Sequence, residues 1–461
     1  MIELRPYQHA IIEEARAHLR AGTRRILIHA PTGSGKTVLT AAMLGKAAAA
    51  GRRSVFNVHR RELIQQSSRT FNAVGIKHAI VAAGFNGDRR QTIQLASIQT
   101  LARRIDALHP PELVVWDECH HIAAKSWASV FQHWPNAVHI GLTATPQRLD
   151  GCGLDEYFDV MVQGPDTRTL IADGFLAPYK MFAPPGVDLT GLHTRMGDYV
   201  QSELAAAVDK PTITGDALAH YRRHLDGKRA VAFCVSVKHS RHVAETFRAA
   251  GIPAAHVDGD TDVALRDQCV KAFERGDLLV LCNVDLFGEG FDLPSMEGVI
   301  LLRPTQSLGL YLQQVGRSLR TSEGKARAVI LDHAGNSSRH GLPDEDREWS
   351  LAGRDRARRK EGERLVPIKT CPTCFAVVHP AVTVCACGHR FVPEGRKVAE
   401  LEGDLVEVDP LVARRAKKAE QAKSESLDDL VALGTRRGYK RPHLWARHIW
   451  NARQARLRGS G

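Results

Sequence analysis

The octapeptide APTGSGKT, residues 30–37, has the composition of a phosphate-binding loop. Glycine lets the backbone turn successive N–H groups inward around phosphate oxygens. The octapeptide follows the apolar run 25–29 and precedes an alanine-rich stretch, so the sequence predicts a strand, a loop and the start of a helix. We expect Lys36 to reach the β- and γ-phosphates of a nucleotide and the Thr37 hydroxyl to hold Mg²⁺. The residues expected to bind the nucleotide are Pro31, Thr32, Gly33, Ser34, Gly35, Lys36 and Thr37.

Two acids, Asp117 and Glu118, directly follow the apolar run 113–116. A nucleotide site with Mg²⁺ needs one acid to hold the metal and a second carboxylate to orient and activate the attacking water. The sequence predicts that Asp117 and Glu118 have these two roles. The Cys-His-His triplet that follows, residues 119–121, has the residue types of a zinc site. Consecutive residues do not readily converge on one tetrahedral ion, so we expect magnesium chemistry here and not zinc.

The elements that must position these groups follow a repeating pattern. Short β-branched or apolar runs alternate with helical patterns over residues 25–145 and again over 229–333. This alternation predicts an α/β fold with two tandem parallel sheets, each covered by crossover helices. The expected segments are a first domain at 1–165, a connector at 166–208, a second domain at 209–335, a charged linker at 336–369, a cysteine-rich module at 370–392 and a basic tail at 393–461, partly disordered with a terminal helix.

Length and charge limit the classes of function. With 461 residues, 43% of them hydrophobic, the chain is long enough for two or three cores of ordinary domain size. Its formal net charge is +12, and residues 351–461 hold 23 Lys and Arg against 13 Asp and Glu, which leaves +10 in that tail. Such an excess favours an anionic partner, and it also suits a solvated surface.

The cysteines do not form the framework of a secreted protein. Five of the nine are scattered singly, and the other four lie between residues 371 and 387. The amino terminus has no apolar signal segment, and no segment approaches the roughly 18 consecutive apolar residues of a membrane span. We therefore expect a cytoplasmic protein, in a bacterium or a phage-infected host and associated with the nucleoid, with no membrane partner.

Taken together, the motifs resemble a known family. The tetrapeptide DECH resembles the DExH motif of superfamily 2 helicases and translocases, and further motifs of that family appear in order. These are LRPYQ at 4–8, DECH at 117–120, TATP at 143–146, GEGFDLP at 288–294 and QQVGRSLR at 313–320. The resemblance covers roughly residues 1–335. It implies two tandem RecA-like domains that bind ATP and Mg²⁺ at their cleft, with a nucleic-acid strand running across both.

The resemblance also implies roles for individual residues. Gln8 is expected to contact the adenine base with support from Arg5, and Gly290, Asp292 and Gln313 are expected to complete the nucleotide site. His120 is expected to link this site to the second domain through the motif that holds Gln313.

Arg317 and Arg320 resemble the arginine fingers of the family. Charge that accumulates on the transferring phosphoryl group needs fixed cations, here in a site that exists only when the domains close. His59, Arg60, Ser97 and Thr100 are the candidate contacts to the strand backbone.

A second cluster of metal-binding residue types lies near the carboxyl terminus. Residues 371–391 pair C-x-x-C with C-x-C across ten residues, an arrangement similar to a zinc ribbon. Four thiolates could bring a structural Zn²⁺ to tetrahedral coordination, and His379 or His389 could substitute for one thiolate. The predicted ligands are Cys371, Cys374, Cys385 and Cys387.

The basic end of the chain interleaves Tyr439, Trp445 and Trp450 with Lys and Arg. These aromatic side chains could stack on bases, or the tryptophans could anchor a terminal helix to the core. The tail could also contact replication or repair proteins.

Residues 331–351, followed by the cysteine cluster, resemble RadD-type and phage-encoded helicases. This resemblance implies an ATP-dependent DNA helicase or translocase in repair, recombination or phage replication, with single-stranded or forked DNA as the partner. Three alternatives share the same motifs: a translocase or restriction-system motor that does not separate strands, an RNA helicase, and a nucleic-acid-binding scaffold with a vestigial motor.

Overall fold

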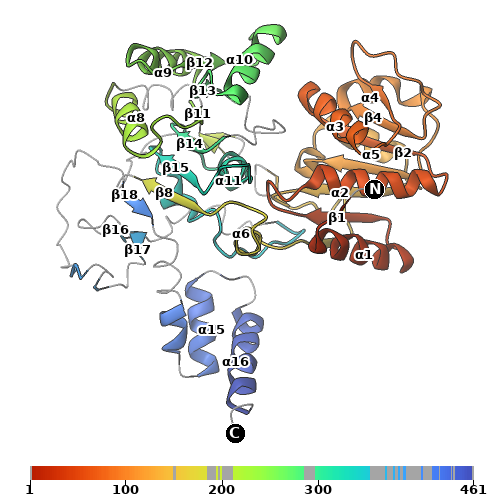
Figure 1. Ribbon diagram of the computed structural model, residues 1–461. Coiled ribbons are helices and arrows are strands. Elements are labelled where there is room, and N and C mark those ends of the chain that lie inside the picture. Colours follow the sequence, from red (N-terminus) through yellow and green to blue (C-terminus); the bar gives the residue numbers. More distant parts are fainter. Residues whose placement is uncertain are drawn as a thin grey trace.

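The first sheet of this computed structural model has seven strands, and all of its strand pairs are parallel. Its order is β3-β4-β2-β5-β6-β1-β7 (Figure 1). The strands are β1 (Arg25–His29), β2 (Ser54–Val58), β3 (Ala79–Val81), β4 (Ile93–Ser97), β5 (Leu113–Asp117), β6 (Val138–Thr143) and β7 (Val160–Gln163). The helices around it are α1 (Pro6–Arg20), α2 (Lys36–Ala49), α3 (Arg61–Ala73), α4 (Ile98–Arg104) and α5 (Lys125–His133).

The second sheet also has seven strands, in the order β12-β13-β11-β14-β15-β8-β18. Its pairs are parallel except the edge pair β8–β18, which is antiparallel. The strands are β8 (Tyr179–Ala183), β11 (Ala230–Phe233), β12 (Ala254–Val257), β13 (Val280–Asn283), β14 (Gly298–Leu301), β15 (Ala328–Asp332) and β18 (Val406–Val408). The helices are α6 (Thr167–Ala172), α8 (Pro211–His224), α9 (Val237–Ala249), α10 (Val263–Arg275), α11 (Leu308–Ser318) and α12 (Asn336–His340).

The structure describes the chain in fifteen segments. They are residues 3–148, 152–183, 194–195, 198–199, 211–284, 296–353, 369–370, 377–378, 383–384, 388–390, 406–408, 418–424, 426–437, 439 and 442–458. Within them also lie the short strand pairs β9 (Thr194–Arg195) with β10 (Asp198–Tyr199) and β16 (Lys369–Thr370) with β17 (Val377–Val378).

Both sheets are covered on two faces, as the sequence predicts. The central strands β2, β11, β14 and β15 are buried along their whole length, which suits parallel strands between helical layers. Each sheet has one hydrophobic core cluster on each side. The prediction of two tandem α/β units is therefore confirmed. The second sheet also takes in β8 and β18, which lie outside the range 209–335 expected for that domain.

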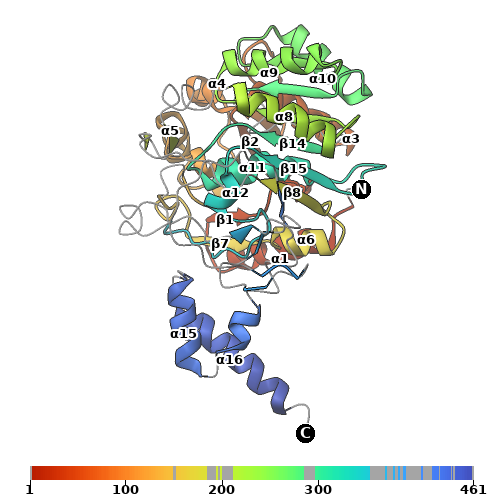
Figure 2. The same cartoon turned by 90° about the vertical axis from the view of Figure 1, so that its left-hand side faces the viewer.

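A pair of helices, α15 (Leu427–Arg436) and α16 (Pro442–Arg458), stands apart from both sheets in two perpendicular views (Figures 1 and 2). Trp445 packs inside this pair, because a Cβ atom at Gly434 would lie 2.9 Å from its ring. Tyr439 contacts the same ring edge-on, with 4.9 Å between ring centroids. Trp445 therefore holds α16 to α15 and not to the core of either sheet, and its stacking on bases stays a prediction.

Other predictions concern residues that the structure describes only in part. The five single cysteines are free thiols, in agreement with the absence of a disulfide framework among them.

None of the helices in the described segments is long and apolar enough to cross a membrane. The four predicted zinc ligands, Cys371, Cys374, Cys385 and Cys387, lie outside the described residues, as do His379, Gly290 and Asp292.

Candidate functional site

The predicted chemical groups gather at one edge of the first sheet. Because its strands are parallel, their carboxyl ends meet at the same edge, where ligands bind in open α/β sheets. His29 ends β1, Asp117 ends β5, Thr143 ends β6 and Ser97 ends β4. His59 follows the end of β2 by one residue, so the predicted nucleotide and nucleic-acid groups share this edge.

The phosphate loop joins β1 to α2 and has the backbone geometry that the sequence predicts. Gly33 and Gly35 have φ angles of 87° and 80°, in the left-handed region that favours glycine, and Gly35 caps α2. The ammonium of Lys36 donates to the carbonyls of Ala30 and Pro31 at 3.2 and 3.4 Å. Burial lowers the pKa of Lys36, because partial removal from water disfavours the charged form.

Two hydroxyl groups of this loop have the environment expected of phosphate ligands. The side-chain oxygens of Thr32 and Ser34 are buried, and neither has a hydrogen-bond partner among the described residues. A buried hydroxyl without a partner is costly in free energy, whereas phosphate oxygens accept hydrogen bonds readily. The loop therefore fits a phosphate group by its own donors, its glycine conformations and its position at the amino end of α2.

The first turn of α1 holds the loop from one side. The Gln8 amide nitrogen donates to the carbonyls of Ser34 and Gly35 at 3.2 and 3.3 Å, and its oxygen accepts from the Arg5 backbone at 3.0 Å. The Tyr7 hydroxyl donates to the Ser34 carbonyl at 2.6 Å. The expected contact of Gln8 with adenine stays a prediction, and the observed role of Gln8 is to support the phosphate loop.

The paired acids lie beside Lys36 in a strained turn. Glu118 has φ 47°, the one positive φ among the described non-glycine residues, a conformation that costs about 1 kcal/mol or more and is frequent at functional sites. Both acids are buried. Burial, with a further contribution from the charge of Glu118, raises the pKa of Asp117 to about 7. The two carboxylates supply oxygen ligands of the type that Mg²⁺ prefers.

His120 connects this acidic turn to the loop after β6. Its Nδ1 lies 3.2 Å from the Thr143 hydroxyl, which donates in turn to the Thr145 carbonyl at 2.9 Å. The nearest Glu118 oxygen is 3.5 Å from the same Nδ1, too long for a good hydrogen bond, and that oxygen has no hydrogen-bond partner in the described segments. Its free lone pairs fit a base that orients water.

Helix α11 of the second domain closes the site from the opposite side. A Cβ atom at Gly316 would lie 2.6 Å from the Cβ of Thr32, and one at Gly33 would lie 3.3 Å from the Cγ of Arg320. The charges of Arg320 and Arg317 both lower the pKa of Lys36, and Arg317 also lowers that of Asp117. The structure thus brings both predicted arginine fingers to the phosphate loop.

The His120 side of the site also reaches α11, the helix that holds Gln313, and the expected link from His120 to Gln313 stays a prediction. A Cβ atom at Gly309, in the first turn of α11, would lie 3.1 Å from the Thr145 hydroxyl. The path therefore runs from His120 through Thr143 and Thr145 to Gly309. Gln313, which the sequence placed on this path, is buried in the same helix.

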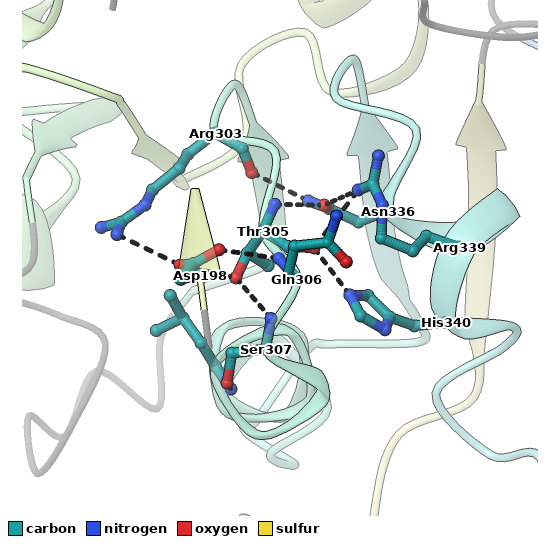
Figure 3. A network of polar contacts seen from close by, with 9 residues as sticks. Asp198, Arg303, Thr305, Gln306, Ser307, Asn336, Arg339 and His340 are labelled. Atoms are coloured by element: carbon teal, nitrogen blue, oxygen red, sulfur yellow. Dashed lines mark hydrogen bonds and ion pairs between the residues drawn. The ribbon is translucent and has the colours of Figure 1, made fainter. Parts of the chain in front are cut away.

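The loop that leads into α11 is fixed by a polar network that the sequence did not indicate (Figure 3). Asp198 of β10 accepts from the Thr305 hydroxyl at 2.9 Å and from the Gln306 backbone at 2.7 Å. The Thr305 carbonyl accepts from Arg339 at 3.2 Å and lies 2.8 Å from a His340 ring nitrogen. These contacts set the direction of α11 and hence of its arginines. No local pattern marks them, because they join residues up to 108 positions apart.

The candidate nucleic-acid contacts lie at or just after the carboxyl ends of β2 and β4, at the same edge of the sheet as the acids. His59 and His121 lie with ring centroids 5.1 Å apart, and the Gln99 amide donates to the His59 carbonyl at 3.2 Å. Arg60, Ser97 and Thr100 are partly exposed around them. Their contact with a strand backbone stays a prediction.

Two family profiles match most of the two-domain region. Residues 1–148 match the family described as "Type III restriction enzyme, res subunit", and residues 210–322 match "Helicase conserved C-terminal domain".

Individual proteins resemble a larger part of the chain. A 51.5 kDa protein of Lactococcus phage (isolate 7-9) is 35% identical over 381 residues, which cover 82% of this chain and 81% of the phage protein. The DNA 3'-5' translocase XPB2 of Sulfurisphaera tokodaii is 24% identical over 376 residues, which cover 72% of this chain and 81% of the relative.

A solved fragment of an HsdR subunit of a type I restriction enzyme from Vibrio vulnificus YJ016 has a similar fold. It aligns with a TM-score of 0.58 at 24% identity, over 73% of this chain and 65% of that chain.

The fold and the shared phosphate site define a P-loop nucleotide hydrolase with two RecA-like domains. The two family profiles, matched one after the other along the chain, define the family more specifically than the fold does. The chain belongs to the superfamily 2 helicases and translocases. It is accordingly a nucleic-acid-dependent ATPase, as the DECH motif and its companion motifs imply.

Glu118 has a buried carboxylate oxygen with no hydrogen-bond partner among the described residues, as expected of a base that activates water. Glu118→Gln should keep ATP binding and lower turnover by about 10²–10⁴-fold, because the amide cannot act as a base. The measurement is ATP affinity by equilibrium binding beside steady-state hydrolysis. Glu112→Gln, at the amino end of β5, is the matched control and should hydrolyse ATP at the wild-type rate. Normal turnover by Glu118→Gln would show that another group orients the water.

Proposed function

We propose that this protein is an ATP-driven DNA helicase or translocase that steps along a strand by opening and closing its two domains. The observation that carries the proposal is the phosphate loop lying against α11, because hydrolysis at that contact must change how the two domains meet. The S. tokodaii relative is named as a DNA translocase, which supports DNA as the polymer. The likeness to a phage protein supports a role in phage replication, repair or recombination.

Each residue of the site has a proposed role. Lys36 and the loop N–H groups bind the β- and γ-phosphates, and Thr37 with Asp117 holds Mg²⁺, which supplies positive charge against the phosphate oxygens. Glu118 accepts the proton of the attacking water. Arg317 and Arg320 stabilise the charge that develops on the transferring phosphoryl group. His59, Arg60, Ser97 and Thr100 bind the strand backbone, and Gly290, Asp292 and Gln313 complete the interdomain site.

Steady-state ATP hydrolysis with different polymers tests this function. Purified full-length protein is assayed alone, with single-stranded DNA, with duplex DNA and with RNA, and Lys36→Ala gives the blank. We expect stimulation by DNA, strongest with single-stranded or forked DNA. Selective stimulation by RNA would instead identify an RNA helicase. No turnover with any polymer would contradict the proposal and favour a nucleic-acid-binding scaffold.

A second candidate is a DNA motor that moves without separating strands, such as the motor subunit of a restriction system. The match of residues 1–148 to the res subunit family and the fold shared with an HsdR fragment favour it. A strand-displacement assay on forked DNA separates the two candidates. Release of single strands supports a helicase, whereas ATP hydrolysis without release supports the translocase.

The cysteines of residues 371–387 are proposed to bind one structural Zn²⁺. The spacing of four thiolates supports this proposal, with His389 or His379 as a substitute ligand. The metal content of the purified protein tests it. Loss of zinc in a Cys371→Ser, Cys374→Ser variant is expected, and a wild-type protein without zinc would contradict it.

The helical pair α15–α16 is proposed as an additional DNA contact. Residues 427–458 contain eight Lys and Arg but two Asp, and Arg436 and Arg447 are exposed. Arg436→Gln with Arg447→Gln should weaken DNA binding and reduce the salt dependence of the binding constant, because fewer counterions are released. Fluorescence anisotropy at several salt concentrations measures both. Unchanged values would contradict a DNA contact and leave this pair to a replication or repair protein.

A further inference from the structure

Two of the described segments cross between the two domains. The first crossing runs from β7 to β8 through α6. The second is the segment 342–353, here called the strap, which leaves the second domain after α12, contacts α6 through Asp344 and ends against Cys152 and Leu154. A second crossing of fixed length limits how far the two domains can separate.

The strap is attached to the second domain by buried polar contacts. The Tyr179 hydroxyl of β8 donates to the Asp344 carboxylate at 2.5 Å, and Arg168 of α6 donates to the Asp344 carbonyl at 3.3 Å. The Arg347 guanidinium donates to backbone carbonyls of the strap and of α12, which fixes the local path of the chain. The acceptors are the carbonyls of His340, Leu342, Pro343 and Glu345.

At its other end the strap is attached to the first domain through the backbone. The Leu154 N–H donates to the Leu351 carbonyl at 2.7 Å, and Cys152 forms an antiparallel bridge with Gly353. A Cβ atom at Gly153 would lie 2.0 Å from the Leu351 oxygen. Only glycine permits this approach, so Gly153 is the residue on which the attachment depends.

Between the two attachments, Trp349 lies against His29, with ring centroids 5.2 Å apart. His29 ends β1 and directly precedes Ala30, whose carbonyl accepts from Lys36 at 3.2 Å. The Nε2 of His29 lies 3.1 Å from the Ala144 carbonyl, in the loop that follows Thr143. Burial lowers the pKa of His29 to about 4, so its ring is neutral at pH 7 and Nε2 can carry the proton that it donates.

The first crossing, which follows β7, starts in contact with His29 as well. A Cβ atom at Gly164 would lie 3.1 Å from the His29 carbonyl oxygen and 3.7 Å from the Cβ of Ala30. Both of these crossings therefore meet the chain at the point where the phosphate loop begins. A change in the distance between the domains must act on His29 through one or both of them.

We propose that the strap couples domain closure to the phosphate loop, and that Trp349 is a positioning residue for ATP hydrolysis that acts through His29. This inference rests on the proposed DNA-stimulated motor. Closure pulls the strap, Trp349 holds the His29 ring, and His29 keeps the start of the phosphate loop and the Ala144 carbonyl in register. The strap therefore affects kcat when DNA drives domain closure. It leaves the affinity of the first domain for nucleotide largely unchanged.

Two variants release the strap without changing a group that contacts nucleotide. Trp349→Ala removes the ring contact, and Gly153→Ala forces the backbone of the strap away from the first domain. For both we expect DNA-stimulated kcat to fall about ten- to a hundredfold, as small displacements of reacting groups do, with KM for ATP and the rate without DNA near wild type. Trp349→Phe keeps an aromatic ring and should restore most of the stimulation.

Glu348→Ala is the matched control, because Glu348 is the neighbouring strap residue and is exposed. It should behave as wild type. A merely structural role would lower the melting temperature and reduce the rates with and without DNA in the same proportion. That result, or full stimulation in both Trp349→Ala and Gly153→Ala, would overturn the proposal.

A second measurement does not depend on DNA. In the Glu118→Gln background, binding of Mg²⁺–ATP should change tryptophan emission, and adding Trp349→Phe should remove at least half of that change. An equal change in both proteins would overturn the coupling of Trp349 to the phosphate loop. If wild-type protein shows the emission change but no DNA stimulation, the proposed DNA motor fails while the link between Trp349 and the site stands.

Discussion

The contact between the phosphate loop and α11 is the constraint on which the rest of the structure depends. Thr32 approaches Gly316 so closely that a methyl group added at Gly316 would lie 2.6 Å from the Thr32 Cβ, and Gly33 lies in tight contact with the Arg320 side chain. A catalytic site formed in this way is complete only while two separately folded sheets hold one arrangement. The free energy of closure and the free energy of catalysis are therefore linked, which is what a motor requires.

Several features of the fold serve to keep that contact in register. The first turn of α1 supports the loop on the side of the first domain, and the network around Thr305 fixes α11 on the side of the second. His120, Thr143 and Thr145 form a polar path from the acids to α11. The strap adds a covalent connection that reaches the start of the loop through Trp349.

The sequence predicts the two sheets and the residues of the phosphate site because both leave local patterns. Buried parallel strands appear as continuous apolar runs, and Lys36, Asp117 and Glu118 each stand directly after such a run or its loop. The sheet then brings them together, since the ends of parallel strands share one edge. The position of these residues at one edge of the sheet could thus be predicted from the sequence.

The structural features that the sequence does not predict depend on contacts between residues far apart in the chain. Asp198 reaches Thr305, and Gly153 meets Leu351, with no pattern at either member that indicates the other. The same holds for β18, which adds to β8 from a tail expected to be partly disordered. Likewise, the family resemblance predicts that Gln8 contacts the adenine base. Its observed contacts to the phosphate loop depend instead on how α1 packs.

The most direct test of the shared site is ATP hydrolysis by Arg320→Gln. Its side chain belongs to the second domain but approaches Gly33 of the first. If α11 completes the site, affinity for ATP should stay near the wild-type value while DNA-stimulated turnover falls by about 10³-fold or more. Unchanged turnover would contradict the account, because the first domain would then hydrolyse ATP without the second.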